Sequence, residues 1–548
     1  MYKTEKYAFN PEEYKEELLQ IFKEIQNSKN WNEDIFRIIQ AKHPKDKSKM
    51  FSKNDLIKGL RYFTKLNLIN NPNQILQRIR MKPVRTLSGV TPVTVLTKPW
   101  ACPGKCIYCP NEPNMPKSYI ESEPGAQRAL FLDFDPYMQT AKRIQSLQHI
   151  GHNTEKIELI VLGGSWSVYP ENYKRWFIKR CFEAMNNPNE EEPNLSETKT
   201  SWEELEQEHK KNETAKHKCV GLSLETRPDL ITKEEVVKLR RYGATKIQLG
   251  VQSLDDEILT KNLRGHTADT TKKAFELLRL AGFKIHAHWM VNLYGATPET
   301  EIEDFQKLWT PNYCPDELKI YPTSVIANTR LAELYNTGEY IPYSTQKLIE
   351  IVGQLKTLVP PFCRITRVIR DIPSQEIIAG SRVSNLRQDV KKYLDEKGLK
   401  CNCIRCREIK QQEVFENDLK LETIQYETTV SKEYFFSFVT PENRIAGFLR
   451  LSVPFENLQE NHFIEELRRS AIIREIHVYG SVVGIGKEEV GKAQHFGLGK
   501  KLIEKAEEIC RENGVKNLAV ISAIGTRDYY RKWNFIQKRN SLYMHKTL

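Results

Sequence analysis

Long hydrophobic runs are missing from this 548-residue chain. The longest apolar stretches, such as residues 157–162, are far shorter than the ~20 residues that cross a bilayer. The first 14 residues, MYKTEKYAFNPEEY, contain no apolar core of the kind that a secretory signal needs. These absences argue against a membrane protein, and we expect a cytoplasmic one.

A disulfide framework is also not indicated. The chain has 11 cysteines, and six of them fall in two tight clusters, at 102–109 and 401–406. Clustered thiols are typical of metal ligation in a reducing compartment rather than of disulfide pairing in a secreted domain. The length allows three or more domains.

The net charge of +12 is concentrated near the N-terminus. Between residues 35 and 100 there are 14 Lys or Arg residues but only two acidic ones, Asp46 and Asp55, with aromatic residues interleaved. This pattern predicts a polyanionic partner, and nucleic acid in particular. An ordinary lysine-rich surface is the alternative. The residues that we expect to contact RNA are Lys45, Lys47, Lys49, Lys53, Arg78, Arg80 and Lys82.

Four regions follow one another along the chain. Residues 1–80 read as a small helical region, and residues 81–360 alternate β-branched runs with amphipathic helices. Such repeats predict an α/β fold, a partial TIM-type barrel, with functional side chains at the carboxyl ends of its strands. The expected strands are 93–97, 157–163, 220–225, 247–251, 285–291 and 318–322.

The remaining regions differ from the barrel in pattern. Residues 361–415 read as a linker that begins with an extended segment at 364–370, and residues 416–548 predict a separate α+β domain. In that domain we expect strands at 435–439, 447–451, 473–478 and 518–522, and helices at 497–512 and 529–533. Residues 186–218 are polar and charged, and they predict a surface insertion.

Cys102, Cys106 and Cys109 form a C-x₃-C-x₂-C run just after the first expected strand. Three thiolates at this spacing can ligate three irons of a 4Fe-4S cluster and leave the fourth iron open. A structural zinc turn or three core cysteines are the alternatives. Zinc needs four ligands, however, and no fourth Cys or His lies along this loop.

An open iron can bind S-adenosyl-L-methionine (SAM), whose reductive cleavage gives a 5′-deoxyadenosyl radical. Several residues at the expected strand ends suit that ligand. The glycines of a Gly-Gly pair allow close backbone approach, and a carboxylate, a guanidinium and an amide supply acceptors and donors. The candidates are Gly163, Gly164, Glu225, Arg227 and Gln252. Taken singly, each could be an ordinary turn residue or a surface ion pair.

A second site is predicted where a glycine-containing turn opens a helix. Glycines there let successive amides face a pyrophosphate at the positive end of the helix. The spacing is similar to the acetyl-CoA signature of GNAT acetyltransferases, with Tyr529 and Tyr530 placed to meet a thioester, or else to fill the core. The turn consists of Gln494, His495, Phe496, Gly497, Leu498, Gly499 and Lys500.

The third cluster, Cys401, Cys403 and Cys406, places three thiols within six residues in the linker. It predicts a structural Zn²⁺ that staples the linker between the two larger domains. The fourth ligand is not identified by the sequence.

Many separate motifs between residues 75 and 548 resemble the family of catalytic Elongator subunits, in which a radical SAM barrel precedes a GNAT domain. The motifs are KPVRTLSGVTPVTVLTKP, EPGAQRALFLDFDPYMQTAKRI, ETRPD, LGVQS, RGHT, KIYPT, RVIRDIP, REIHVYGSVV and GTRDYYRKWNF. The short cysteine spacing is similar to that of archaeal or bacterial members. The segment MVNLYG at 290–295 departs from the family's usual MPNLPG-like form.

The resemblance implies an enzyme that builds a carboxymethyl group on carbon 5 of the wobble uridine of tRNA. The adenosyl radical would abstract a hydrogen atom from the methyl group of acetyl-CoA, and the resulting carbon radical would add to the base. Oxidation and thioester hydrolysis would then leave carboxymethyluridine and free CoA. The mouth of the barrel and the thioester end of the GNAT domain would then face one closed cavity.

The same resemblance implies partners, and the residues before the glycine turn suggest a lid. The partners are the tRNA anticodon stem-loop, acetyl-CoA and an electron donor for the cluster. A homodimer is compatible with it, and further Elongator subunits are not required. The charged loop Gly484 to Lys492 could keep acetyl-CoA out until tRNA arrives.

Two rival functions are open at this stage. One is a protein lysine acetyltransferase with a structural iron-sulfur site, in which Glu475 or His477 would be the general base. The other is a non-catalytic RNA-binding scaffold.

Overall fold

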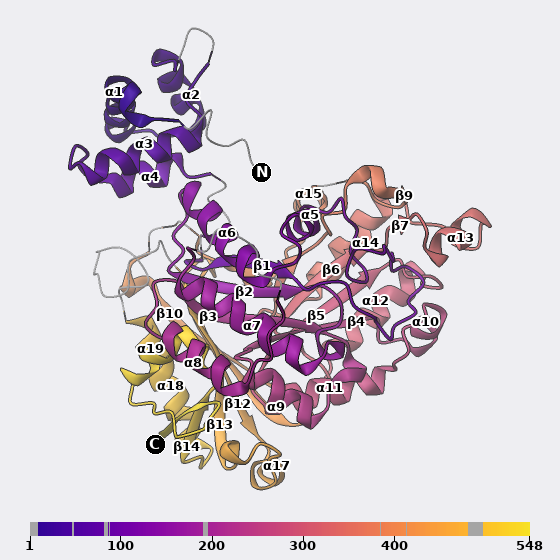
Figure 1. Cartoon of the computed structure of the whole chain (residues 1–548). Helices are drawn as coiled ribbons and strands as arrows, with labels where there is room; N and C mark the ends of the chain where they lie inside the picture. The colour runs from indigo at the N-terminus through magenta and orange to yellow at the C-terminus, as the bar shows by residue number, and fades with distance from the viewer. Residues whose placement is uncertain are drawn as a thin grey trace.

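The computed structural model of the chain (Figure 1) describes residues 9–45, 49–81, 86, 88–189, 196–383, 385–410, 412, 414–479 and 497–548. Several predicted site residues lie outside the described residues. They are Lys47, Lys82, Gln494, His495, Phe496 and the loop Gly484 to Lys492.

The N-terminal region folds as a group of helices around its own apolar core. α1 buries Leu18, Ile21, Phe22 and Ile25, a spacing that places all four on one helical face. The helices are α1 (Lys15–Asn27), α2 (Glu33–Lys42), α3 (Lys53–Lys65) and α4 (Pro72–Ile79). The helical prediction for this region is therefore confirmed in its element type.

The main body is a curled, seven-stranded parallel sheet with the strand order β1-β2-β3-β4-β5-β6-β8, a half-barrel. Its strands are β1 (Thr91–Leu96), β2 (Lys156–Leu162), β3 (Lys218–Thr226), β4 (Lys246–Gln252), β5 (Lys284–Val291), β6 (Glu317–Pro322) and β8 (Arg364–Arg367). All six strands predicted for the barrel are present. The expected linker from residue 361 onward begins within the barrel instead, because β8 pairs in parallel with β6 and completes the sheet.

Helices cover the outer face of the half-barrel (Figure 1). They include α6 (Pro136–His149), α7 (Glu171–Asn186), α9 (Lys233–Arg241), α11 (Ala268–Leu280), α12 (Pro298–Lys307) and α14 (Thr345–Thr357). The predicted insertion contains α8 (Trp202–Asn212), which is more than a surface loop because it buries Leu205 and His209. Among the described residues no helix is both long and apolar enough to cross a membrane.

Shorter helices surround the carboxyl ends of the strands and the linker. They are α5 (Pro124–Phe131), α10 (Asp256–Lys261), α13 (Arg330–Asn336), α15 (Leu386–Glu396) and α16 (Ile404–Arg407). A two-stranded pair, β7 (Val325–Ile326) with β9 (Ile377–Ala379), lies beside α13.

The C-terminal domain is a six-stranded sheet, antiparallel except for one parallel pair, β13 with β14. Its strands are β10 (Lys420–Glu427), β11 (Ser431–Val439), β12 (Ile445–Pro454), β13 (Ser470–Val478), β14 (Asn517–Val520) and β15 (Met544–Thr547). The helices α17 (Glu456–Glu460), α18 (Leu498–Glu512) and α19 (Arg527–Arg531) complete it. The α+β prediction is confirmed.

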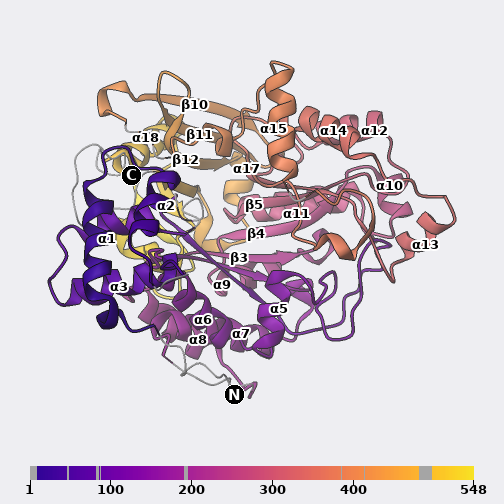
Figure 2. The same ribbon diagram turned by 90° about the horizontal axis from the view of Figure 1, so that it is seen from above.

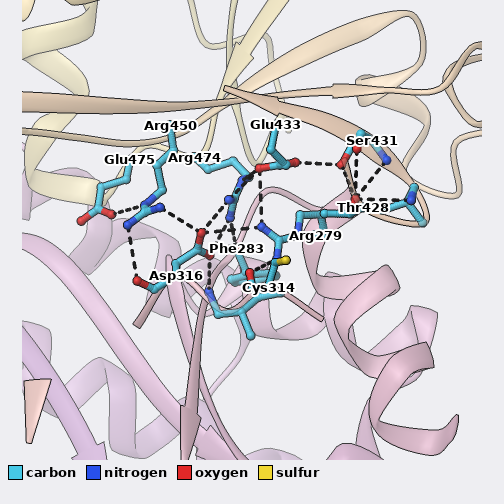
Figure 3. Close-up of polar contacts among 12 residues, drawn as sticks. Arg279, Phe283, Cys314, Asp316, Thr428, Ser431, Glu433, Arg450, Arg474 and Glu475 are labelled. Atoms are coloured by element: carbon cyan, nitrogen blue, oxygen red, sulfur yellow. Dashed lines mark hydrogen bonds and ion pairs between the residues drawn. The ribbon is translucent and has the colours of Figure 1, made fainter. Parts of the chain in front are cut away.

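A buried network of ions joins the two sheets (Figure 3). Asp316, just before β6, accepts two hydrogen bonds of 2.7 Å from Arg474 of β13, and both side chains are fully buried. Arg474 also donates to Glu433 of β11 at 3.0 Å, and Arg450 of β12 lies 3.4 Å from Asp316. These contacts fix the C-terminal sheet against the starts of the parallel strands.

Figures 1 and 2 agree on where the other regions lie relative to the parallel sheet. The N-terminal helices and the C-terminal sheet lie beyond the amino ends of the parallel strands, whereas α10 and α13 lie at the opposite end (Figures 1 and 2).

Candidate active site

Four of the predicted sites follow neighbouring strands at the carboxyl edge of the half-barrel. The cysteine loop comes after β1, Gly163 and Gly164 come after β2, Glu225 ends β3, and Gln252 ends β4. β1 to β4 are adjacent in the sheet and all parallel, so these residues gather at one edge, as the sequence predicted.

The cysteine loop does not gather its three thiols as tightly as a single-ion site would. Cys106 is 8% exposed. Among the residues that the structure describes, the sulfur atoms of Cys102, Cys106 and Cys109 do not all lie within 4.8 Å of one another, unlike those of the second cysteine cluster, although Cys106 and Cys109 are hydrogen-bonded to each other. A single zinc ion holds its thiolates at ≈2.3 Å and so needs a tight group, whereas a cluster spreads its ligands.

Arg264 is a functional residue to which sequence reasoning gave no role. Its Nη1 lies 3.1 Å from the Cys106 sulfur, and its Nη2 donates to the Gly250 carbonyl at 2.5 Å. A hydrogen bond with Cys109, and then the charge of Arg264, lowers the pKa of Cys106 to about 4. The RGHT motif that contains Arg264 was the only available signal.

Arg227 has a different role from the predicted one. Its guanidinium makes a double hydrogen bond with Asp229, at 2.9 and 3.1 Å, and donates to the Arg264 carbonyl at 2.6 Å. A Cβ at Gly104 would lie 2.3 Å from Arg227 Nη1, so a larger residue there would displace this end of the guanidinium. Arg227 therefore positions Arg264 and the cysteine loop, and its fork is not free for a ligand carboxylate.

The other carboxyl-edge residues are arranged to receive a ligand. Gln252 has a φ of 72°, and its buried Oε1 has no hydrogen-bond partner among the described atoms. Gly163 has a φ of 130°, and a Cβ there would lie 2.0 Å from Thr97 Oγ1. Burial raises the pKa of Glu225, whose Oε1 lies 3.9 Å from His288 Nδ1.

A cavity of about 640 Å³ lies at the opposite, amino edge of the strands. It is lined by the first residues of six strands, Lys156, Lys218, Lys246, Lys284, Glu317 and Arg364. The facing wall, which includes Gly497, Gly499, Tyr529 and Tyr530, comes from the C-terminal domain. The expectation that the thioester end faces the mouth of the barrel is therefore wrong, because the C-terminal sheet is attached at the amino edge.

The structure describes the glycine turn before α18 from Gly497 onward. Gly497 caps α18 with a φ of 61°, and a Cβ at Gly499 would lie 2.3 Å from the Tyr529 hydroxyl. Leu498 is buried at 1% exposure and belongs to the core, whereas Lys500 lies 3.5 Å from Glu504 on the surface.

The remaining polar residues of this cavity differ in whether they already have a bonding partner. Tyr530 is 5% exposed and packs edge-on against Phe535. Glu475, a candidate base, accepts hydrogen bonds from Lys284 at 2.6 Å and Arg450 at 2.9 Å. Burial lowers the pKa of His477 to about 4, and its Nε2 has no partner among the described atoms.

The linker cysteines converge as predicted. The sulfur atoms of Cys401, Cys403 and Cys406 all lie within 4.8 Å of one another, and hydrogen bonds from the other two thiols hold the pKa of Cys403 well below its usual value. Within the described part of the chain no fourth His, Cys, Asp or Glu joins this group.

A larger cavity of about 1400 Å³ opens between β1, β8 and the linker. Lys and Arg outnumber Asp and Glu in its lining by 12 to 5, so the cavity is suited to a polyanion. Sequence reasoning missed this surface. Its signal was the run of basic residues from 387 to 410, close to the linker cysteines.

The predicted RNA-binding residues of the N-terminal region are partly engaged within it. Lys45 pairs with Asp55 at 3.5 Å and Lys53 with Glu33 at 3.1 Å, and burial lowers the pKa of Arg80. The guanidinium of Arg78 donates to backbone carbonyls of α1 and covers the Trp31 ring. Lys49 is exposed and makes no ion pair with any described residue.

Sequence comparisons place these features in a known context. Residues 101–308 match the Radical SAM superfamily, and residues 315–396 match the Radical_SAM C-terminal domain. The chain is 40% identical over 487 residues to the tRNA uridine(34) acetyltransferase of Methanocaldococcus infernus, which spans 86% of this chain and 88% of that protein. It is 36% identical over 477 residues to Elongator complex protein 3 of Homo sapiens, over 84% of each chain.

A solved structure gives the same result. The archaeal Methanocaldococcus infernus Elp3 lacking residues 1–46 superposes with a TM-score of 0.69 at 35% identity, covering 84% of this chain and 99% of that chain. With relatives this similar over most of its length, the chain belongs to the family of radical SAM proteins that includes Elongator complex protein 3 and the tRNA uridine(34) acetyltransferases.

Proposed function

We propose that this protein is a tRNA-modifying enzyme that uses SAM and acetyl-CoA to build a carboxymethyl group on carbon 5 of the wobble uridine. The observation that carries the proposal is the arrangement of one half-barrel. It has a cysteine loop at one edge, a glycine-capped helix at the other and a cationic cavity between β1 and β8. The relatives named for tRNA uridine(34) support the substrate.

Cys102, Cys106 and Cys109 would hold the 4Fe-4S cluster, which supplies the electron that cleaves SAM to the adenosyl radical. Arg264 and Arg227 hold the loop around those thiols. The amino group of the ligand would meet the backbone at Gly163 and Gly164. The unpartnered Gln252 oxygen and the buried Glu225 carboxylate would accept hydrogen bonds from it.

Acetyl-CoA would bind with its pyrophosphate at the amino end of α18, which Gly497 caps. Gln494, His495 and Phe496, which lie outside the described residues, would belong to the same binding turn. Tyr529 would lie beside the thioester. His477, neutral and with an unpartnered Nε2, could accept a hydrogen bond from the attacking water and orient it during hydrolysis.

The lysine acetyltransferase rival is weakened by Glu475, whose two ion pairs occupy it. Glu475 also has a lowered pKa, because Lys284 and Arg450 outweigh its burial, and this makes it a poor base. That rival predicts acetyl transfer to protein without SAM.

The linker cysteines would bind Zn²⁺, with water or a residue of a bound partner as the fourth ligand. Cys401 and Cys406 line the cationic cavity, so the metal would fix the shape of that wall.

Anaerobic reconstitution with iron, sulfide and SAM, followed by nucleoside analysis of tRNA, tests the proposed function. Carboxymethyluridine formed only with both SAM and acetyl-CoA would support it. Protein acetylation without SAM would favour the rival, and RNA binding with no product would favour a scaffold.

We expect tRNA affinity to fall steeply with salt. If ~5 phosphates of a single-stranded loop are neutralised, the slope of log K against log salt concentration should be roughly −3.5. The slope can be measured by filter binding, and a slope near zero would remove the basic surfaces from RNA binding. Lys49→Ala should make this salt slope shallower. Lys391, which pairs with Asp395 on α15, lines the larger cavity, so the salt slope of Lys391→Ala tests whether the wall of that cavity binds RNA.

We expect Tyr529→Phe to slow the release of free CoA from acetyl-CoA by roughly 100-fold, the usual scale for one proton-transferring group. The reason is the position of its hydroxyl at the glycine turn. Tyr530→Phe is the matched control, because Tyr530 packs in the core beside Phe535. Wild-type release by the Tyr529 variant would exclude its hydroxyl from the site.

Arg264→Gln should lower the reduction potential of the reconstituted cluster. The reduced cluster carries more negative charge, so the cation 3.1 Å from the Cys106 sulfur favours reduction. A tenfold change in the reduced fraction corresponds to about 59 mV for one electron. Potentiometric titration measures the reduction potential of each variant, with Arg264→Lys as the charge-preserving control. An unchanged potential in the Gln variant would limit Arg264 to a structural role.

A further inference from the structure

The two proposed half-reactions lie at opposite edges of the same strands. The cysteine loop follows the carboxyl end of β1, whereas the glycine turn and Tyr529 face the first residues of the strands. β2 has seven residues, and at ≈3.3 Å per residue it separates the two edges by roughly 20 Å.

Rotation of the domains does not remove this separation. Asp316, Arg474 and Glu433 are 0–1% exposed and mutually bonded across the interface between the two sheets. Opening that interface would leave buried charges without partners, which costs several kcal/mol. The C-terminal domain therefore remains at the amino edge during the reaction.

The two cavities meet inside the half-barrel. Both are lined by Glu158, Lys246, Glu317 and Arg364, which form a layer at the amino edge. From this layer the larger cavity continues past Thr94, Ile160, Gln248, His286, Lys319 and Thr366. It ends at Leu162 and Arg367, the last residues of β2 and β8.

On these grounds, and resting on the function proposed above, we propose that the interior of the half-barrel is a passage. Through it the two-carbon acyl unit travels from the acetyl-CoA cavity at the amino edge to the cysteine-loop edge.

The polar groups of this interior suit an acyl or carboxylate oxygen. Lys246 lies between Glu158 and Glu317 in the layer where the cavities meet, at 3.1 Å from Glu317. Beyond it, Lys319 contacts the Gln248 amide oxygen and forms no ion pair with any described residue. An ammonium group without a carboxylate partner can attract an anionic or carbonyl oxygen inside the barrel.

Two forms of the same unit fit this chemistry, an acyl group still attached to the pantetheine arm and free acetate. Supplying isotopically labelled acetate with unlabelled acetyl-CoA separates them. Label in the uridine product would indicate free acetate, and its absence would indicate delivery on the arm.

The test is to obstruct the middle of the passage. Ile160 pairs in register with Thr94 of β1 and Ser223 of β3 and lines the cavity, so Ile160→Trp should fill it. Ile160→Leu is the matched control, and Thr94→Trp repeats the obstruction from the neighbouring strand if the first variant does not fold.

Three quantities are measured in each protein: CoA release by the cluster-free protein, deoxyadenosine formation by the reconstituted protein, and carboxymethyluridine. We expect both partial reactions to persist in the Trp variants and the coupled product to fall by roughly 100-fold. Wild-type amounts of product would overturn the passage, and so would loss of CoA release, since Ile160 would then belong to the acetyl-CoA site. Absence of product in the wild-type protein would instead refute the proposed function.

Discussion

Replacing Cys106 with alanine should abolish the formation of 5′-deoxyadenosine from SAM. Cys106 is the central thiol of the loop, the proposed cluster ligand that Arg264 contacts. Two remaining thiols cannot hold a cluster of four irons, and without the cluster there is no electron for SAM cleavage. Iron and sulfide content should fall to background, as measured by chemical analysis and by the visible absorption of the reconstituted protein.

The fold and RNA affinity should survive that substitution. Cys181→Ala is the matched control, because Cys181 is also a buried thiol but lies on α7, where it packs in the apolar core of the protein. It should retain the cluster and the SAM reaction. Deoxyadenosine formed at the wild-type rate by the Cys106 variant would assign these cysteines to a structural site.

Asp316→Asn should destabilise the folded protein by about 3–5 kcal/mol, the usual cost of removing one partner from a buried ion group. Asp316 accepts two hydrogen bonds from Arg474, and Arg450 and Arg279 lie 3.4 and 3.6 Å away (Figure 3). An amide cannot compensate three guanidinium groups. Urea unfolding of the two proteins measures the difference.

The matched control is Asp395→Asn, which removes a surface carboxylate that pairs with Lys391 and is 61% exposed. It should change stability by less than about 1 kcal/mol. Equal losses of unfolding free energy in the two variants would show that the buried network stabilises the fold no more than a surface ion pair does.

The same carboxylate predicts how stability depends on pH. Burial alone would raise the pKa of Asp316, but Arg474, Arg450 and Arg279 outweigh it and hold the pKa well below its ordinary value of ≈3.9. The stabilisation is therefore fully present above the unfolded-state value and is lost as the pH falls toward the folded-state value. In the Asn variant this part of the acid dependence should disappear.

This network also bears on mechanism. A preformed and rigid domain interface keeps the cysteine loop and the amino end of α18 at fixed positions, so the passage proposed above calls for movement of the small reactant rather than of the domains.

The amino-acid sequence by itself was enough to predict each local chemistry. The cysteine spacing, the glycines before α18 and the linker thiols depend on neighbours a few residues away, so chain geometry restricts them. Strand positions were also predictable, because buried parallel strands read as apolar runs. β8 was predicted as an extended segment but assigned to the linker, because its four residues, Arg364–Arg367, include only one apolar side chain and do not read as a buried strand.

Only the tertiary structure decided how these sites face one another. Arg227 pairs with Asp229 instead of a ligand, and Arg264 reaches Cys106 across 158 positions in sequence, contacts that no local pattern encodes. The attachment of the C-terminal sheet to the amino edge rests on Asp316 meeting Arg474, again 158 residues apart. Pairings of this kind depend on the burial and packing of whole domains, and they determine that the two proposed cofactor sites lie at opposite edges of the parallel strands rather than across the mouth of the barrel.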